Sequence, residues 1–163
     1  MKNILLVIDM QKGFIKEKKN FISKIKKHLD TFNYDDIIFT KFINKSESNF
    51  VKRLKWNGMT SEPSTDIVEE LKEYAEFHTI EKNTYSVLKS KQFIDYFKEQ
   101  NKENIKFYIC GVDTDACILA TAFEFFDMGY NFEIIRDLIT SNNINLHFYT
   151  EEIIKRNINF KEN

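Results

Sequence analysis

Three reactive side chains of different types each come just after a short apolar run of the sequence. Asp9 follows ILLVI, Lys82 follows HTIE, and Cys117 lies in the turn after FYICGV. A thiol can attack a carbonyl carbon, and a carboxylate can accept the thiol proton and return it to the leaving group. An ammonium group beside them would keep the carboxylate ionised and stabilise the thiolate. These residue types therefore predict nucleophilic hydrolysis by acyl transfer to Cys117.

The position of Cys117 supports a reactive role for its thiol. It follows the turn Gly111–Ala116 and begins an apolar segment, Cys117–Met128, that predicts a helix ended by Gly129. The positive end of the helix dipole and the unpaired N–H groups of the first turn both favour a thiolate there. The same N–H groups can bind the oxyanion of a tetrahedral intermediate. The second cysteine, Cys110, lies inside an apolar run and is expected only to pack.

Short β-branched runs alternate with amphipathic segments along the chain. The predicted strands are Ile4–Ile8, Asp36–Phe42, His78–Lys82, Lys106–Val112 and Asn131–Arg136, with a short sixth at Asn157–Phe160. The predicted helices are Phe21–Phe32, Ser46–Lys55 capped by Ser46, a segment that opens at Pro63, Ser90–Gln100, Cys117–Met128 and Leu146–Arg156. Strands separated by helices are typical of an α/β fold, with a parallel sheet covered on both faces. Ligands bind outside the carboxyl ends of such strands, so Asp9, Lys82 and Cys117 are expected to meet in one crevice.

Length, composition and charge exclude several classes of protein. The chain has 163 residues, of which 42% are apolar and 30% charged, and its net charge is −1. This length predicts one domain over residues 1–163, with a core that needs no disulfides. Without excess positive charge, neither nucleic acid nor a membrane surface is an expected partner. Two cysteines without C-x-x-C spacing, and no apolar run near the roughly 18 residues of a membrane span, predict a cytoplasmic protein.

Three segments of the sequence resemble the isochorismatase-like cysteine hydrolases, a superfamily of nicotinamidases, carbamoyl-amide hydrolases and isochorismatases. They are Leu5–Phe14, Glu81–Leu88 and Cys110–Tyr130, and the segment Arg136–Ser141 also fits. The resemblance implies a Rossmann-like, three-layer α/β/α fold with a mostly parallel sheet of five to six strands. It also implies that the chemistry is carried out by a catalytic triad rather than by a bound cofactor.

The resemblance assigns roles to particular residues. It implies a triad of Asp9, Lys82 and Cys117, a cis peptide bond between Val112 and Asp113, and an oxyanion hole formed by the backbone N–H groups of Ala116 and Cys117. Metal-binding nicotinamidases carry an Asp-x-His…His cluster after the second strand. The corresponding stretch here, TKFINKSESNFVKRLKW, contains no histidine, so no metal ion is expected.

The presence of a cysteine bears on the bond that is cleaved. Isochorismatases cleave a vinyl ether and need no covalent thiol step, whereas Cys117 beside Asp and Lys favours hydrolysis of a C–N bond. The expected substrate is a small amide, carbamoyl or ureido compound. Two alternatives stay open: a vinyl ether hydrolase of the isochorismatase type, and a catalytically silent sensor or scaffold of the same fold.

Positions near the predicted strand ends indicate which side chains form the substrate pocket. Gln11, Phe14, Trp56 and Tyr85 are the candidates, and aromatic walls suit a small flat substrate. Asn49 and Arg53 are further candidates for contact with a polar end of a substrate, but exposed positions on the predicted helix explain them better.

The phenylalanines of the segment Cys117–Met128 predict that the protein forms a homo-oligomer. Phe123, Phe125 and Phe126 lie on more than one side of the predicted helix, so they cannot all face one sheet. Part of this helix is therefore expected to be buried between subunits, in a homodimer or a higher homo-oligomer.

Overall fold

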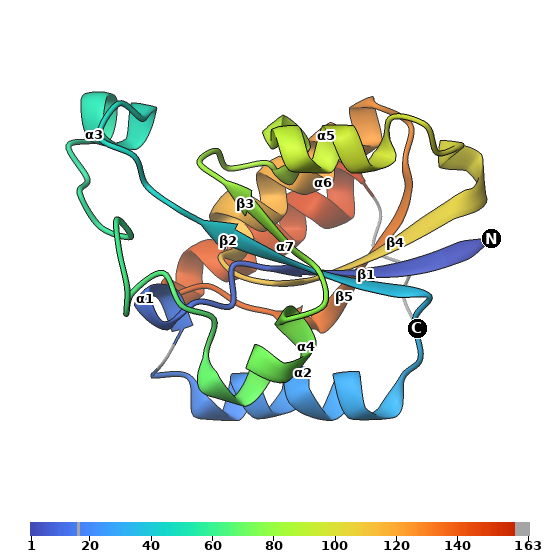
Figure 1. Ribbon diagram of the computed structural model, residues 1–163, viewed down its shortest axis with the longest axis horizontal. Helices are drawn as coiled ribbons and strands as arrows, with labels where there is room; N and C mark the ends of the chain where they lie inside the picture. Colours follow the sequence, from blue (N-terminus) through green and yellow to red (C-terminus); the bar gives the residue numbers. More distant parts are fainter. Residues whose placement is uncertain (16, 159–163) are drawn as a thin grey trace.

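The computed structural model describes residues 1–15 and 17–158, which form a parallel sheet between two helical layers (Figure 1). The strands are β1 (Lys2–Ile8), β2 (Asp36–Phe42), β3 (Thr79–Lys82), β4 (Ile105–Gly111) and β5 (Asn131–Ile139). Their order is β3-β2-β1-β4-β5, and every neighbouring pair is parallel. The predicted three-layer α/β/α fold with a mostly parallel sheet is confirmed.

The central strand β1 shows why its sequence is apolar without alternation. Every residue from Ile4 to Ile8 is fully buried. Ile4, Leu6 and Ile8 face one core of the molecule, while Leu5 and Val7 face the other. A strand covered on both faces must be apolar at every position, so the continuous ILLVI run places β1 in the middle of the sheet.

Two sets of helices cover the sheet. On one face lie α5 (Lys91–Phe97), α6 (Leu119–Asp127) and α7 (Ile144–Asn157), and on the other lie α2 (Lys19–Thr31) and α4 (Lys72–Ala75) (Figure 1). The short helices α1 (Lys12–Ile15) and α3 (Asn49–Leu54) follow the carboxyl ends of β1 and β2. Three 3₁₀ turns occupy Glu69–Leu71, Val87–Lys89 and Lys102–Asn104, and a π turn occupies Thr114–Ile118. Within the described residues, no helix has both the length and the apolar character needed to cross a bilayer.

Two of the helix predictions are corrected near the carboxyl edge of the sheet. α3 begins at Asn49, and its N-cap is Ser48 rather than Ser46, because the Ser48 side chain accepts a hydrogen bond from the Val51 amide. No helix opens at Pro63. The carbonyls of Asp66 and Ser64 instead accept hydrogen bonds from the first two amides of α1, at 2.8 Å each, so they are not available for helical bonding.

The predicted sixth strand is also wrong where it can be compared with the structure. Asn157 ends α7, and the amide of Ile158 donates to the Ile154 carbonyl at 2.8 Å, which continues the helical bonding pattern by one residue. The remaining two positions of that prediction, Asn159 and Phe160, lie outside the described residues.

Candidate active site

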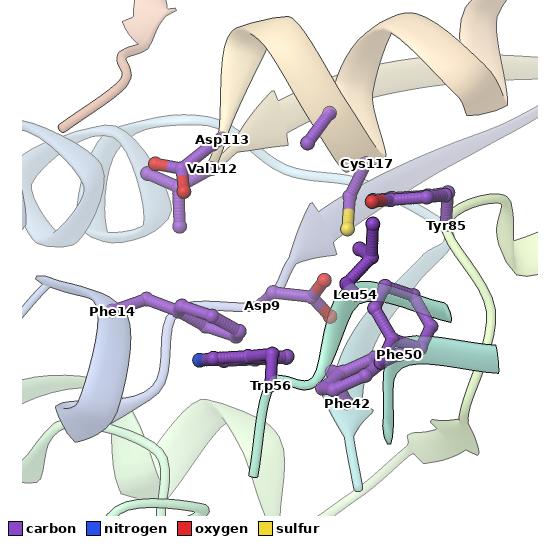
Figure 2. A pocket seen from close by; sticks show the side chains of 11 residues that line it. Asp9, Phe14, Phe42, Phe50, Leu54, Trp56, Tyr85, Val112, Asp113 and Cys117 are labelled. Atoms are coloured by element: carbon purple, nitrogen blue, oxygen red, sulfur yellow. The ribbon is translucent and has the colours of Figure 1, made fainter. Parts of the chain in front are cut away.

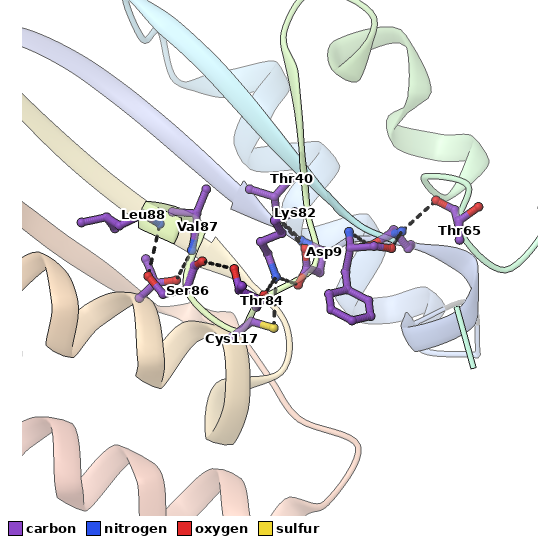
Figure 3. Close-up of polar contacts among 12 residues, drawn as sticks. Asp9, Thr40, Thr65, Lys82, Thr84, Ser86, Val87, Leu88 and Cys117 are labelled. Carbon is purple, nitrogen blue, oxygen red and sulfur yellow. Dashed lines mark hydrogen bonds and ion pairs between the residues drawn. The ribbon is translucent and has the colours of Figure 1, made fainter. Parts of the chain in front are cut away.

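The structure brings together the three reactive side chains that are far apart in the sequence. Asp9 follows β1, Lys82 ends β3, and Cys117 lies in the π turn after β4. Lys82 Nζ donates to Asp9 Oδ2 at 2.7 Å and to Cys117 Sγ at 3.3 Å (Figure 3). The exposed fractions of Asp9, Lys82 and Cys117 are 1%, 4% and 8%, so the cluster lies beneath the surface.

The carboxylate of Asp9 is held by a side chain of the neighbouring strand. Thr40 Oγ1, on β2, donates to Asp9 Oδ1 at 2.6 Å and accepts from the Asp9 amide at 3.1 Å. Asp9 itself has a positive φ of 51°, which turns the chain sharply where β1 ends. Thr40 was not identified from the sequence. The sequence does show a hydroxyl side chain inside the buried strand DIIFTKF, and a buried hydroxyl group needs a hydrogen-bond partner.

Every N–H of the Lys82 ammonium group has an acceptor. Besides Asp9 and Cys117, it donates to the Thr84 carbonyl at 3.0 Å, and it lies 5.3 Å from the ring centre of Phe42. Burial opposes the positive charge, but the Asp9 carboxylate and the Cys117 sulfur outweigh this effect and raise the pKa of Lys82. Lys82 is therefore a permanent cation in the cluster.

The thiol of Cys117 differs from the sequence-based expectation of a thiolate. Burial raises the pKa of Cys117 well above its ordinary value, and the charge of Asp9 adds to this increase while Lys82 opposes it. Cys117 also does not begin an α-helix, because α6 starts two residues later at Leu119. The raised pKa of the resting Cys117 therefore favours a neutral thiol over a preformed thiolate.

The backbone around Cys117 forms a compact turn. The Val112–Asp113 peptide bond is cis, as the family resemblance implied. The amides of Ala116 and Ile118 both donate to the Asp113 carbonyl, at 3.1 and 3.2 Å, and the amide of Cys117 lies between them in the chain. The Ala116 N–H therefore already has an acceptor in the resting structure. Single π turns of this kind occur frequently at functional sites.

The turn is also anchored to the rest of the helical layer. The amide of Thr114 donates to the Thr140 carbonyl at 3.0 Å, and Thr114 Oγ1 lies 2.9 Å from His147 Nδ1 on α7. Glu151, one turn further along α7, forms a two-point ion pair with Arg136 on β5, at 2.9 and 3.1 Å. These contacts hold the turn that carries Cys117 against β5 and α7.

A cavity of about 220 Å³ opens above Asp9 and Cys117 (Figure 2). Three of the predicted pocket residues, Phe14, Trp56 and Tyr85, lie on its wall. Its full lining is Asp9, Phe14, Phe42, Phe50, Leu54, Trp56, Tyr85, Val112, Asp113, Ala116 and Cys117. Phe42, Phe50 and Leu54 were not identified from the sequence, because apolar residues of a strand and a helix have the same pattern whether they face a core or a cavity.

Gln11 is the predicted pocket residue that the structure places elsewhere. It is fully buried, and its side-chain amide donates to the carbonyls of Phe42 and Thr65 at 2.9 and 2.8 Å. Its oxygen accepts from the Phe42 amide at 2.7 Å. Gln11 therefore ties the loop after β1 to the end of β2 and to the segment after Pro63, and it does not line the cavity.

Asp113 brings a second carboxyl group to the cavity. Burial raises its pKa to about 6, although a hydrogen bond from the Asn142 amide, at 3.3 Å, partly opposes this increase. In contrast to Asp9, it has no lysine within hydrogen-bond distance in the described part of the chain. No three His, Cys, Asp or Glu side chains among the described residues are grouped closely enough to hold a metal ion.

Comparison with known proteins identifies the class to which this fold and site belong. Residues 3–157 match the family model of the isochorismatase domain, and the chain belongs to the isochorismatase-like hydrolase family. Isochorismatase family protein 1A of Dictyostelium discoideum is 23% identical over 128 residues, which cover 76% of this chain and 61% of that protein. The chain therefore matches less than two thirds of the length of this relative.

Solved structures of the same fold cover nearly the whole chain. An isochorismatase-like hydrolase from Alkaliphilus metalliredigens superposes with a TM-score of 0.79 at 19% identity, covering 96% of this chain and 92% of the other. A nicotinamidase from Bacillus subtilis gives 0.77 at 18% identity, with 98% of each chain covered. N-carbamoylsarcosine amidase from Thermoplasma acidophilum gives 0.74 at 16% identity, covering 96% and 92%. At such identities the similarity establishes the fold, and the activity must be argued from the site.

Proposed function

We propose that the protein is a cysteine hydrolase that cleaves the C–N bond of a small amide, carbamoyl or ureido compound through an acyl-Cys117 intermediate. The observation that carries this proposal is the contact of one ammonium group, Lys82 Nζ, with both Asp9 and Cys117 at the base of a cavity. A nucleophile, a base and a fixed cation are the groups that covalent acyl transfer requires.

The geometry supports a two-stage reaction in which Asp9 moves the proton. Asp9 accepts the Sγ proton as the sulfur attacks the substrate carbonyl carbon, and Lys82 stabilises the charge that remains. As the C–N bond breaks, the amine leaves with the proton from Asp9, and a thioester forms on Cys117. Water then attacks the thioester and gives its proton to Asp9, which returns it to the sulfur as the acid product leaves.

The raised pKa of Cys117 fits this order of events. Because a raised pKa favours the neutral thiol, the proton has to be removed as the substrate binds, and Asp9, whose carboxylate contacts the same Lys82 ammonium group as the sulfur, is the proposed base. The N–H of Cys117 is the proposed donor to the oxyanion of the tetrahedral intermediate. The Ala116 N–H joins it only if its hydrogen bond to the Asp113 carbonyl is released.

The size and composition of the cavity support a small planar substrate. A volume of about 220 Å³ admits a compact molecule, and five of the eleven residues that line the cavity are aromatic. Phe14 and Trp56 are stacked with ring centroids 6.3 Å apart, and Phe42 and Trp56 with centroids 5.8 Å apart. By their names, the nicotinamidase and the N-carbamoylsarcosine amidase of the same fold both act on C–N bonds, which agrees with the proposed reaction.

The proposal is tested by an ammonia-release screen over primary carboxamides, N-carbamoyl compounds and ureides. For any compound that turns over, Cys117→Ala is expected to lower kcat/KM by at least about 10³-fold, because the nucleophile is removed. Intact-protein mass spectrometry should also detect an acyl adduct on the wild type that the variant lacks. Cys110→Ala is the matched control, since Cys110 is buried in β4 and does not line the cavity.

Full activity of Cys117→Ala would rule out the covalent mechanism. Release of pyruvate from isochorismate, without ammonia from any amide, would instead identify a vinyl ether hydrolase. Slow alkylation of Cys117 by iodoacetamide would not by itself indicate a silent scaffold, because burial and a raised pKa already slow the reaction of the resting thiol.

A further inference from the structure

A second cavity adjoins the one above Cys117 and differs from it in chemical character. It has a volume of about 270 Å³ and shares Phe50, Leu54 and Tyr85 with the first cavity. Its other lining residues are Asn49, Arg53, Asn83 and Thr84. These supply two amides, a hydroxyl and a guanidinium group, and no carboxylate lines this cavity, whereas the first cavity has aromatic walls and two carboxylates.

Within the described part of the chain, the guanidinium group of Arg53 has no partner of opposite charge. Its neighbour Lys52 pairs with Glu47 at 2.7 Å. Among residues 1–15 and 17–158, no carboxylate or other acceptor is paired with the Arg53 side chain. A guanidinium group offers a planar pair of N–H donors that matches the two oxygens of a carboxylate.

The two cavities are neighbours because they share the wall residues Phe50, Leu54 and Tyr85. Phe50 and Tyr85 form an edge-to-face pair with ring centroids 4.8 Å apart, and both line both cavities. Phe50, Leu54 and Tyr85 lie on one side of Cys117, while Val112 and Asp113 lie on the other (Figure 2). A molecule held over Cys117 therefore has a negative carboxyl group on one side and, beyond the shared wall residues, the Arg53 guanidinium on the other.

We propose that the second cavity binds a carboxylate group of the substrate through Arg53, with Asn49 and Asn83 as additional hydrogen-bond donors. The substrate class is then an amide or carbamoyl compound whose far end carries a carboxylate, and this inference rests on the function proposed above. The charges also orient the molecule, because Asp113 repels a carboxylate on its side of Cys117 and Arg53 attracts it on the opposite side. The scissile C–N bond is thereby directed toward the sulfur.

Pairs of substrates in which a methyl group replaces the carboxylate separate the contribution of the carboxylate from that of the rest of the molecule. Succinamate is compared with butyramide, and N-carbamoylglycine with ethylurea, for the wild type and Arg53→Gln. Arg53→Gln is expected to lower kcat/KM for the two anionic compounds by about 10- to 100-fold, the range for loss of a charged hydrogen bond, with most of the effect on KM. The neutral compounds should be affected less than about threefold, and Arg53→Lys should restore part of the loss.

The adjacent cation provides the control. Lys52→Gln removes a positive charge from the same helix at a position that lines neither cavity, so it is expected to leave both substrate pairs unchanged. An equal loss for anionic and neutral compounds in Arg53→Gln, or no loss for either, would overturn the carboxylate site.

A binding measurement keeps this inference separate from the proposed reaction. Succinate and 1,4-butanediol have the same four-carbon chain, but only succinate carries carboxylates, and their binding to the wild type and to Arg53→Gln by calorimetry requires no turnover. If Arg53→Gln weakens the binding of succinate by at least about 10-fold but not that of 1,4-butanediol, the site stands even where Cys117→Ala remains active. If the binding of neither compound is affected while Cys117→Ala is inactive, the carboxylate site fails and the proposed reaction survives.

Discussion

The protonation of Lys82 and of Cys117 decides what the site can do. Despite burial, the Asp9 carboxylate and the Cys117 sulfur raise the pKa of Lys82, burial raises the pKa of the Cys117 thiol, and Lys82 lies within hydrogen-bond distance of both Asp9 and Cys117. The pair Asp9–Lys82 carries no net charge, so it can be buried without an uncompensated ion. Thr40 holds the second oxygen of Asp9, which fixes the direction in which the carboxylate presents itself to the sulfur.

The buried carboxyl group of Asp113 is expected to make the stability of the protein depend on pH. Because burial raises its pKa to about 6 in the folded state, the folded protein binds more protons than the unfolded chain between roughly pH 4 and pH 6. The stability that the neutral carboxyl contributes is present below about pH 4 and is lost as the pH rises through 6. Asp113→Asn is uncharged at every pH, and its amide oxygen can still accept from Asn142. It should therefore be more stable than the wild type above pH 6, by up to about 2 kcal/mol.

The measurement is urea unfolding of both proteins between pH 4 and pH 8. The stability difference should shrink toward zero as the pH falls to 4. Asp95→Asn is the control, because Asp95 is an exposed carboxylate on α5 and its replacement should give a small difference that varies little with pH. A difference between Asp113→Asn and the wild type that is the same at every pH would contradict the proposed burial of a titrating carboxyl.

The sequence predicts which reactive side chains follow the strands, but it does not predict which other side chains form the hydrogen bonds that fix the site in place. Asp9, Lys82 and Cys117 could be placed together because parallel strands end at the same edge of a sheet. Thr40 and Gln11 act through contacts 31 residues away, and no local pattern specifies those partners. The neutral state of the Cys117 thiol could not be predicted either, because it depends on burial and on the charge of Asp9.

At the scale of elements, the close approach of β1 and β4 just before the site depends on a glycine. Gly111 has a φ of +116°, and a Cβ atom there would lie 2.1 Å from the Ile8 carbonyl oxygen. Gly111→Ala is expected to destabilise the protein by at least about 3 kcal/mol, because both the backbone strain and the contact with Ile8 are unfavourable. This corresponds to a fall in Tm of about 6–12 °C, measured by calorimetry.

Gly129 is the matched control for this prediction. It also has a positive φ, of +69°, but nothing lies within 4 Å of the position of its Cβ atom. Gly129→Ala should therefore show only the cost of the left-handed conformation, about 1–2 kcal/mol. Equal losses in the two variants would mean that the contact between the strands contributes nothing.

The elements that were predicted correctly are those whose contacts follow from a local pattern. The strand Asp36–Phe42 agrees with β2 at both ends, because a buried parallel strand is an apolar run with a clear start and stop. The segment after Pro63 has the residue types that typically begin a helix. Its backbone carbonyls nevertheless accept hydrogen bonds from the first amides of α1. Such long-range pairing overrides local helix propensity and cannot be read from a single segment.

At the scale of the whole molecule, the chemistry lies at the carboxyl edge of the sheet, and several large apolar side chains are exposed on the helical layer that contains α6 and α7. As expected, the phenylalanines of α6 do not all face the sheet. Phe125 is fully buried and packs edge-to-face on Phe107, with ring centroids 4.9 Å apart, whereas Phe126 is 54% exposed. α7, in the same layer, exposes more large apolar side chains than a solvent-facing helix requires, namely Ile144, Leu146, Phe148, Tyr149 and Ile153.

We propose that a second copy of the chain covers α7 in a symmetric homodimer. A twofold axis brings the same helix of both copies together, so each exposed ring has an apolar counterpart without any change in sequence. Phe148 is 56% exposed on α7, and Phe148→Glu would place two carboxylates at the proposed interface. Sedimentation velocity at micromolar concentration should show a dimer for the wild type and an at least about 10-fold weaker dimer for this variant. Phe77→Glu, which changes an 89% exposed ring after α4, should leave the wild-type assembly intact, and a wild type that sediments as a monomer would rule out this interface.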